Sequence, residues 1–294
     1  MFEQYIEEEK IEEQPKDPYL AAREEADVML HNFEFIKKED IIQIKPEKFK
    51  DETPVFVSPG WGSIPKMHLE NLEAIAEEGR EVISVPFSRE QKIEERNGFI
   101  AEFQKALTII EAIDKSGASQ VDAIGHSEGG LNLALAASLH PEKFRSIVLV
   151  GAAGMVGKDS YFDLVKRFTI DEGIKEFKMR EQSNMNSFFG YMKGILKYMA
   201  HNPLLAHQEI KEISQADIFE MTRYLKEKGV GVGVICGVND QVFPIERVLK
   251  SLDEKKIDHF LSTKGNHGSF VFNKEHAALA EELLSLMAKE REGK

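Results

Sequence analysis

The chain alternates short apolar runs with amphipathic stretches of helical spacing from residue 54 onward. The apolar runs predict strands, and the stretches with apolar residues three or four positions apart predict helices. Strands are expected over 54–60, 81–87, 120–125, 146–154, 231–237 and 257–263, and helices over 67–79, 99–117, 129–141, 244–255 and 273–292. This order predicts right-handed crossovers and a mainly parallel sheet. Strands that are apolar throughout fit a sheet covered on both faces.

The alternation stops at residue 155 and resumes near residue 230. The residues between are helical in pattern and rich in methionine and aromatic side chains, so we expect a helical cap inserted between two sheet strands. Such a layer needs its own core, and the same side chains suit an adaptable pocket for an apolar acyl group. The predicted division is an acidic N-terminal arm with the first strands (1–50), a core in two parts (51–154 and 229–294) and the cap (155–228).

Composition restricts the partners. The net charge is −13, from 51 acidic and 38 basic residues among 294, which argues against nucleic acid and anionic membranes as partners. No window approaches the roughly 18 apolar residues of a membrane span, and the Glu-rich start is unlike a signal peptide. We therefore expect a cytoplasmic protein. The single cysteine, Cys236, lies in an apolar run and is expected to be a buried strand residue.

One hydroxyl lies between glycines where a predicted strand ends and a helix begins, in "AIGHSEGGLNLA" (123–134). Gly-x-Ser-x-Gly alone is a weak motif, but strand before and helix after is the setting in which a serine is held on a sharp, strained turn. The start of the helix directs backbone N–H groups towards the place where negative charge would develop. Ser127 is therefore the candidate nucleophile.

A serine nucleophile needs a base, and histidine suits this at neutral pH. Of the nine histidines, His267 in "TKGNHGSF" follows the last predicted strand in a glycine-flanked loop. That is the strand edge at which open α/β sheets build their sites. His126 adjoins Ser127 in sequence, but its side chain should point away from the serine. We therefore select His267 as the base.

The histidine needs a carboxylate that fixes its tautomer. Asp240 in "CGVNDQVFP" follows the strand before the last one, and this position favours it over an ordinary turn aspartate. Asp159, in the loop after 146–154, is the second candidate.

Two donors are needed for an oxyanion. The backbone N–H of Glu128, the residue after the candidate nucleophile, would be one, and that of Trp61 in "SPGWG" after the first strand would be the other. The Trp61 side chain can also form a wall of the acyl site. Two alternatives stay open for the Glu128 carboxylate, which would either tune His267 or disfavour anionic substrates.

Over about residues 50–290 the chain resembles the capped serine hydrolases of the α/β-hydrolase fold superfamily, through "SPGWG", "GHSEGG", "GVNDQVFP" and "GNHGSF". The resemblance implies an eight-stranded, mostly parallel sheet flanked by helices, with a helical cap after the sixth strand. It also implies hydrolysis of carboxylic esters or related acyl bonds, without cofactor or metal. One departure is Pro59-Gly60 where the family usually has His-Gly.

The predicted function is therefore that of a serine hydrolase acting on esters of a small, largely apolar acyl substrate. Thioesterase, amidase, perhydrolase and carbon–carbon bond hydrolase activities use similar triads and stay open as alternatives. A nucleophilic aspartate, as dehalogenases and epoxide hydrolases require, is absent from position 127. The non-enzyme alternative is a hydrolase-fold binding protein, which would usually lack a triad member.

Overall fold

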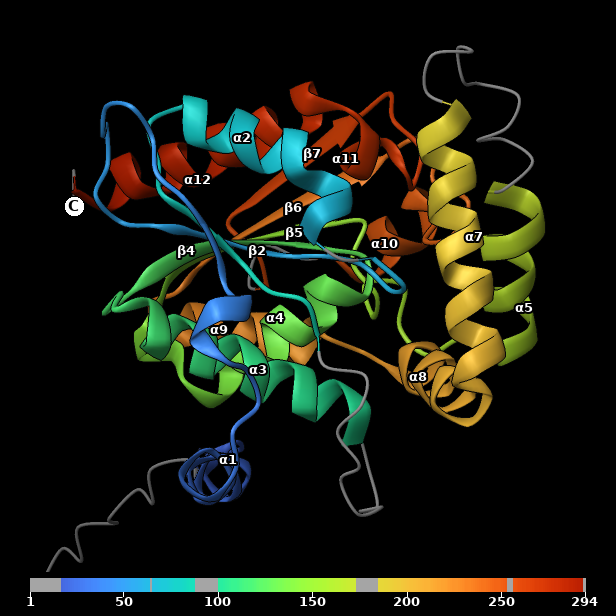
Figure 1. The fold of residues 1–294 in the computed structure, drawn as a ribbon, viewed down its shortest axis with the longest axis horizontal. Coiled ribbons are helices and arrows are strands. Elements are labelled where there is room, and N and C mark those ends of the chain that lie inside the picture. Colours follow the sequence, from blue (N-terminus) through green and yellow to red (C-terminus); the bar gives the residue numbers. More distant parts are fainter. Residues whose placement is uncertain (1–16, 64, 88–99, 173–184, 253–255, 293–294) are drawn as a thin grey trace, which may run out of the picture.

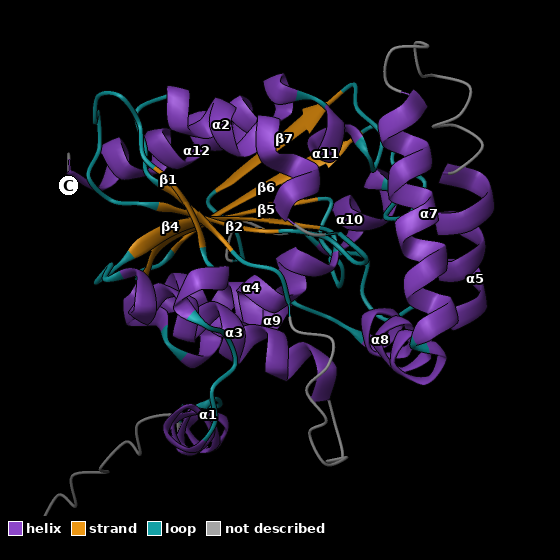
Figure 2. Ribbon diagram, in the orientation of Figure 1, coloured by secondary structure: helices purple, strands orange, loops and turns teal. Residues whose placement is uncertain are grey.

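A seven-stranded sheet forms the centre of the computed structural model, which describes residues 17–63, 65–87, 100–172, 185–252 and 256–292 (Figures 1 and 2). Its strand order is β1-β3-β2-β4-β5-β6-β7. Only β1 is antiparallel to its neighbour, and every other pair is parallel. The strands are β1 (Ile42–Ile44), β2 (Val55–Ser58), β3 (Val82–Ser84), β4 (Val121–His126), β5 (Phe144–Val150), β6 (Gly231–Gly237) and β7 (His259–Thr263).

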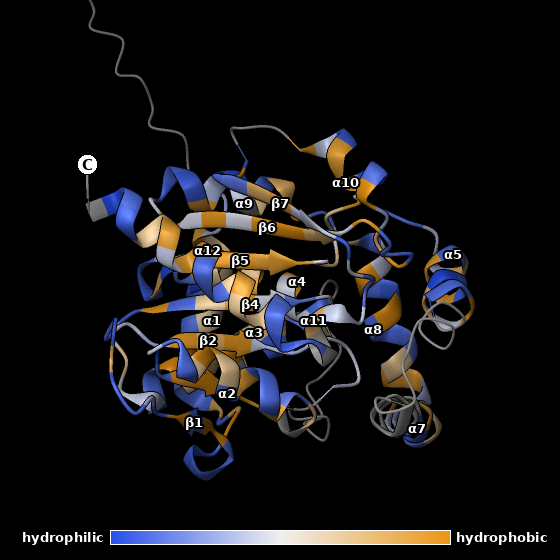
Figure 3. Ribbon diagram, turned by 90° about the horizontal axis from the view of Figure 1, so that it is seen from above, coloured by the Kyte–Doolittle hydropathy of each residue, from blue (hydrophilic) through white to orange (hydrophobic). Residues whose placement is uncertain are grey.

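Both faces of the sheet are buried, because successive side chains of each inner strand enter different cores. Phe56 of β2 and Ile147 of β5 belong to one core, whereas the next residues, Val57 and Val148, belong to the other. Figure 3 shows the apolar colour running through the central strands, with polar positions on the outer helices. The uninterrupted apolar runs of the sequence therefore reflect two buried faces.

Helices cover the two faces in separate layers. In Figure 1, α1 (Leu20–Asn32), α3 (Ile100–Ser116), α4 (Glu128–Leu139) and α9 (Phe219–Glu227) lie on one side, and α2 (Leu69–Glu77), α11 (Ser269–Phe272) and α12 (Lys274–Glu292) on the other. The short helix α10 (Ile245–Ser251) follows β6. None of the helices in the described part of the chain is long and apolar enough to cross a membrane.

Between β5 and β6 the described residues form helices joined by turns, without a strand. Four of these elements stand beside the sheet edge in Figure 1, and we call them the inserted helices: α5 (Tyr161–Lys166), the π-helix η4 (Arg167–Glu172), α7 (Met185–His201) and α8 (Pro203–Gln215). Helix α9 packs on α4 and β6 instead. The predicted cap also included residues 173–184, which lie outside the described ranges.

The mostly parallel α/β fold class predicted from the sequence is confirmed, with a different strand count. The described residues contain seven strands, where eight were expected, and the helical insertion follows the fifth of them. Only β1 precedes β2, and residues 20–32 form a helix. Their run "LAAREEADVMLHN" is rich in Ala, Leu, Glu and Met, which favour helix over strand. Residues 1–16 of the predicted N-terminal arm lie outside the described ranges.

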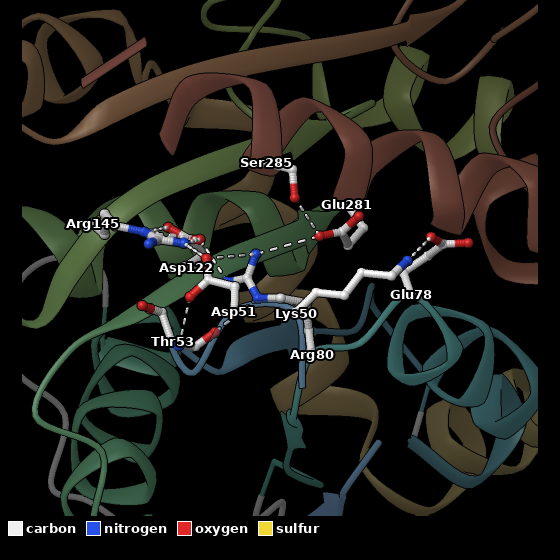
Figure 4. A network of polar contacts seen from close by, with 9 residues as sticks. All are labelled: Lys50, Asp51, Thr53, Glu78, Arg80, Asp122, Arg145, Glu281 and Ser285. Carbon is white, nitrogen blue, oxygen red and sulfur yellow. Dashed lines mark hydrogen bonds and ion pairs between the residues drawn. The ribbon is translucent and has the colours of Figure 1, made fainter. Parts of the chain in front are cut away.

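A buried ion network closes the end of the sheet where β4 begins (Figure 4). Arg80 is only 1% exposed, and its Nη2 donates to Oδ2 of Asp122 on β4 at 2.7 Å. Its Nη1 lies 3.3 Å from Oε1 of Glu281 on α12 and 3.6 Å from Oδ2 of Asp51. Arg145 of β5 donates to the same Asp122 carboxylate. The network therefore joins β4, β5 and α12 at the end of β4 remote from Ser127.

We expect Asp122→Ala to lower the free energy of unfolding by about 3–5 kcal/mol, because it leaves two guanidinium groups without their shared buried carboxylate. Urea unfolding followed by circular dichroism measures this change. The matched control is Lys50→Ala, which removes the exposed Lys50–Glu78 pair and should cost less than about 1 kcal/mol. Equal effects of the two substitutions would contradict a stabilising role for the buried network.

Candidate active site

Ser127 occupies a strained turn between β4 and α4. Its backbone has φ 56° and ψ −124°, and it is the only non-glycine residue with positive φ in the described ranges. Such strain persists only where the surrounding structure holds it. Here the Ser127 N–H donates to the carbonyl of Val150 at 3.0 Å, and its carbonyl accepts from Gly130 and Ala153 at 3.0 and 2.9 Å. The turn is therefore held by α4 and by the end of β5 with the loop that follows it.

Glycine is required on both sides of this turn for lack of space. A Cβ at Gly125 would lie 2.6 Å from Cα of Gly130, and a Cβ at Gly129 would lie 2.3 Å from the carbonyl oxygen of Ser58. Both clashes are with backbone atoms, which cannot rotate away. The motif glycines therefore allow α4 to pack closely against β4 and the end of β2.

Chain reversal places this turn at the centre of the sheet edge. In the sheet, β3 pairs with one side of β2 and β4 pairs with its other side. The connections that leave β2 and β4 therefore run in opposite directions from two neighbouring strands. Ligands of open α/β sheets bind at such a switch point. Trp61 follows β2 and Glu128 follows Ser127, so the two residues predicted to donate to an oxyanion come from these two loops.

The structure brings Ser127, His267 and Asp240 into one hydrogen-bonded series. Nε2 of His267 lies 3.0 Å from Oγ of Ser127, and its Nδ1 lies 2.8 Å from Oδ2 of Asp240. All three side chains are buried. A carboxylate can only accept, so Nδ1 carries the proton and Nε2 is the acceptor for the serine hydroxyl.

Asp240 is held by its own loop after β6. Its Oδ1 accepts from the backbone N–H groups of Val242 and Phe243 at 2.8 and 2.9 Å, which leaves Oδ2 for the histidine. Asp159, the second candidate for the acid, instead forms ion pairs with Arg167 and with Arg247, the latter at 2.9 Å. The structure thus places Asp240, and not Asp159, on His267.

Glu172 contacts the candidate site and was not predicted from the sequence. This buried glutamate of η4 accepts the backbone N–H of His267 at 2.7 Å through Oε1 and that of Gln241 at 3.0 Å through Oε2. Burial raises the pKa of its carboxyl group. Glu172 is 69 and 95 residues distant from its two partners, and no local motif marks it.

His126 also contacts the loop that carries His267. As expected from the sequence, it does not contact the serine hydroxyl. Burial lowers the pKa of His126 well below its usual value, so the ring is neutral and its Nε2 donates to the carbonyl of His267 at 2.8 Å. Its ring also stacks on Phe270 with centroids 5.6 Å apart.

An apolar cavity of about 120 Å³ opens onto Ser127. The inserted helices supply most of its wall, and Trp61 with the loop after β6 supplies the remainder. Its lining is mostly aliphatic and aromatic. The few residues with polar groups are Ser127, Thr169, Tyr161 and Trp61. The lining residues are Trp61, Ser127, Tyr161, Leu164, Val165, Phe168, Thr169, Ile195, Leu196, Met199, Ile210, Ile213, Val242 and Phe243.

Neither a group of metal ligands nor a reactive thiol is found among the described residues. The described residues include no group of three or more His, Cys, Asp or Glu side chains arranged to hold a metal ion. Cys236 is 2% exposed in β6, and burial raises the pKa of its thiol to about 12. The thiol is therefore protonated at neutral pH and inert as a nucleophile, as its apolar sequence predicted.

Comparison with solved structures gives the same fold at low sequence identity. A carboxylesterase of the thaumarchaeon Nitrososphaera gargenis has a TM-score of 0.63 at 16% identity over 85% of this chain and 95% of its own. An esterase of Exiguobacterium antarcticum gives 0.60 at 18% identity over 84% and 94%. The enol-lactonase of Burkholderia xenovorans LB400 gives 0.59 at 14% identity over 85% and 96%.

Comparison by sequence identifies the family. No curated protein matches the sequence. The family model described as alpha/beta hydrolase fold matches residues 82–274, which run from β3 to the start of α12 and include Ser127, Asp240 and His267. This match covers more than half of the chain, and the chain therefore belongs to the alpha/beta hydrolase fold family, as its sequence motifs predicted.

Proposed function

We propose that this protein is a serine hydrolase that cleaves carboxylic esters with a small, apolar acyl group. The observation that carries the proposal is the series Asp240–His267–Ser127, in which each hydrogen bond is 3.0 Å or shorter. A serine is activated when a base contacts it and a third group orients the base. The series also ends in the apolar cavity, where an acyl group would replace water.

In the proposed reaction Oγ of Ser127 attacks the ester carbonyl while its proton passes to Nε2 of His267. The tetrahedral oxyanion would accept from the backbone N–H groups of Trp61 and Glu128. His267 then gives its proton to the departing alkoxide, and an acyl-enzyme remains. Water attacks this intermediate while His267 takes a proton from it. His267 then returns a proton to Oγ of Ser127 as the carboxylic acid is released. Asp240 stabilises the imidazolium in both halves.

The helix N-terminus supports the choice of Glu128 as donor. Glu128 is the first residue of α4, and the first four N–H groups of a helix have no acceptor within it. The partial positive charge of this helix end favours a nearby oxyanion. The inserted helices form the proposed cap, since they wall the cavity on the side away from the sheet.

Esters are favoured among the acyl substrates. Two of the similar solved structures are named as esterases and a third as a lactonase, which also opens a carboxylic ester. Thioesterase, amidase, perhydrolase and carbon–carbon bond hydrolase activities use the same three side chains and are distinguished by a substrate panel. A pure binding protein is disfavoured, because it has no need of three buried polar side chains in this contact.

Ser127→Ala should abolish both ester hydrolysis and labelling by a fluorophosphonate, since it removes the attacking oxygen. Asp240→Asn should lower kcat about 10⁴-fold, because the amide favours the wrong histidine tautomer. Nitrophenyl ester hydrolysis and gel fluorescence measure these effects. Asp159→Asn is the control and should leave kcat within a few-fold of wild type; a large loss there, with Asp240→Asn unaffected, would assign the acid to Asp159.

Glu172→Ala should lower kcat by roughly one order of magnitude with little change in KM, because a small displacement of a base from its reacting partner is costly. The substitution releases the His267 and Gln241 backbone N–H groups from their shared acceptor. Steady-state kinetics with a nitrophenyl ester and the rate of fluorophosphonate labelling both report this loss. Wild-type rates in Glu172→Ala would show that the two loops hold their positions without it. Glu275→Ala, at an exposed site, provides the control.

Acyl length should be limited by the cavity. The cavity has a volume of about 120 Å³, and a water-sized group needs roughly 10–15 Å³ of cavity volume. The cavity therefore holds on the order of ten such groups. We expect kcat/KM for nitrophenyl esters to be greatest for short and medium chains and to fall steeply for long ones. Phe168→Ala removes part of the apolar wall, which enlarges the cavity, and should shift the optimum to longer chains. An unchanged chain-length profile in that variant would place the acyl group elsewhere.

A further inference from the structure

A lysine is buried with three carboxyl groups directly behind the candidate active site. Nζ of Lys105 on α3 lies 2.6 Å from Oε1 of Glu128, 2.9 Å from Oε1 of Glu209 and 3.3 Å from Oε1 of Glu102. The side chain of Lys105 is 10% exposed and those of the three glutamates 3% or less. Glu128 belongs to the nucleophile helix, whereas Glu209 comes from α8 in the inserted helices. The cluster therefore joins the core to the insertion.

The cluster continues to Trp61. Oε2 of Glu209 accepts from the indole Nε1 of Trp61 at 2.8 Å and from the hydroxyl of Tyr198 on α7 at 2.5 Å. The indole is also packed edge-on against the Tyr198 ring, with centroids 5.8 Å apart. A continuous polar path thus runs from Trp61 through Glu209 and Lys105 to Glu128.

Its two ends are the residues whose backbone N–H groups would hold the oxyanion. We infer that Lys105 and Glu209 are positioning residues that fix the spacing of these two donors and make it depend on the seating of helix α8. This inference rests on the proposed function, since it concerns the oxyanion site of that reaction. It also gives the Glu128 carboxylate a role different from both sequence-based alternatives, because the carboxylate points to Lys105.

Charge makes the path rigid. The surrounding carboxylates raise the pKa of Lys105 well above its usual value despite burial, and Lys105 lowers the pKa of Glu209. These two groups therefore form a buried ion pair, and the Glu128 carboxylate lies 2.6 Å from the same ammonium. Loss of Lys105 would leave its buried carboxylates without a cation. Burial and the neighbouring Glu128 raise the pKa of Glu102 well above its usual value.

A path that positions oxyanion donors acts on the transition state and not on ground-state binding. This separates the inference from a purely structural anchor for α8, which would change stability and the binding of any cavity ligand together. An alkyl boronic acid forms a tetrahedral adduct with a serine and places an oxygen in the oxyanion site. The alkanol of equal chain length enters the cavity but forms no tetrahedral adduct with the serine, and it serves as the reference ligand.

The test uses Glu209→Gln, Lys105→Met and Trp61→Phe in the full chain. Glu209→Gln has a single carbonyl oxygen, which replaces the acceptor for Trp61 or the one for Lys105 but not both. Trp61→Phe removes the indole N–H without removing a buried charge. We expect kcat to fall about 10- to 100-fold, below the loss for a deleted oxyanion donor, and affinity for the boronic acid to fall by the same factor. In Glu209→Gln and Lys105→Met, whose side chains do not line the cavity, KM should stay within about two-fold of wild type and inhibition by the alkanol should not change.

Non-additivity provides a second readout. Because Trp61 and Glu209 act along one path, the double variant Trp61→Phe/Glu209→Gln should lose no more activity than the more impaired single variant. Lys115→Met is the matched control, since Lys115 lies on the same helix and pairs with Glu34 and Glu111 far from Ser127. It should retain wild-type kcat and boronic acid affinity.

Two failures are distinguishable. If the wild type hydrolyses esters through Ser127 but Trp61→Phe and Glu209→Gln keep its kcat and boronic acid affinity, the positioning role is wrong. Equal losses of boronic acid and alkanol affinity would likewise reduce the path to an anchor for α8. If Ser127→Ala keeps the activity of the wild type, the proposed function itself is wrong.

Discussion

The site depends on the turn that carries the chain from β4 into α4 with Ser127 at φ 56°. This strained conformation raises the hydroxyl above the sheet edge and at the same time begins a helix beside it. It requires the two flanking glycines, since each would otherwise meet backbone within 2.6 Å. The cost of the strain is offset by hydrogen bonds to the end of β5, the loop after it and α4, so the conformation depends on the assembled sheet and helix.

The inserted helices line the cavity and also hydrogen-bond to residues at the candidate site. Glu172 reaches the His267 and Asp240 loops from η4, and Glu209 reaches Trp61 and Lys105 from α8. Both are buried carboxylates whose partners are backbone N–H groups, an indole or a buried ammonium. Burial of such groups is tolerated only when they are fully paired. The inserted helices are therefore bonded to both sides of the candidate site.

The opposite end of the sheet uses the same chemistry for a different purpose. Arg80 and Arg145 both pair with Asp122 of β4, and Arg80 also pairs with Glu281 of α12, at the end of β4 remote from Ser127. Asp122 and His126 lie on one strand, β4, and the network at its start and the turn at its end fix that strand at both ends. Rigidity of β4 is useful to a site that depends on a turn at its terminus.

The sequence by itself determined the α/β class and most strands and helices, and it predicted Ser127 and His267 as site residues with Asp240 or Asp159 as the acid, because periodicity and glycine spacing are local signals. The eight strands implied by the family resemblance were one more than the seven that the described residues form. Only the tertiary structure decided between Asp240 and Asp159, and it alone showed Glu172, Lys105 and Glu209. Apart from the local contacts of Lys105 with Glu102 and of Glu209 with Tyr198, their partners lie between 23 and 148 residues away in the chain, so contact depends on how the elements pack.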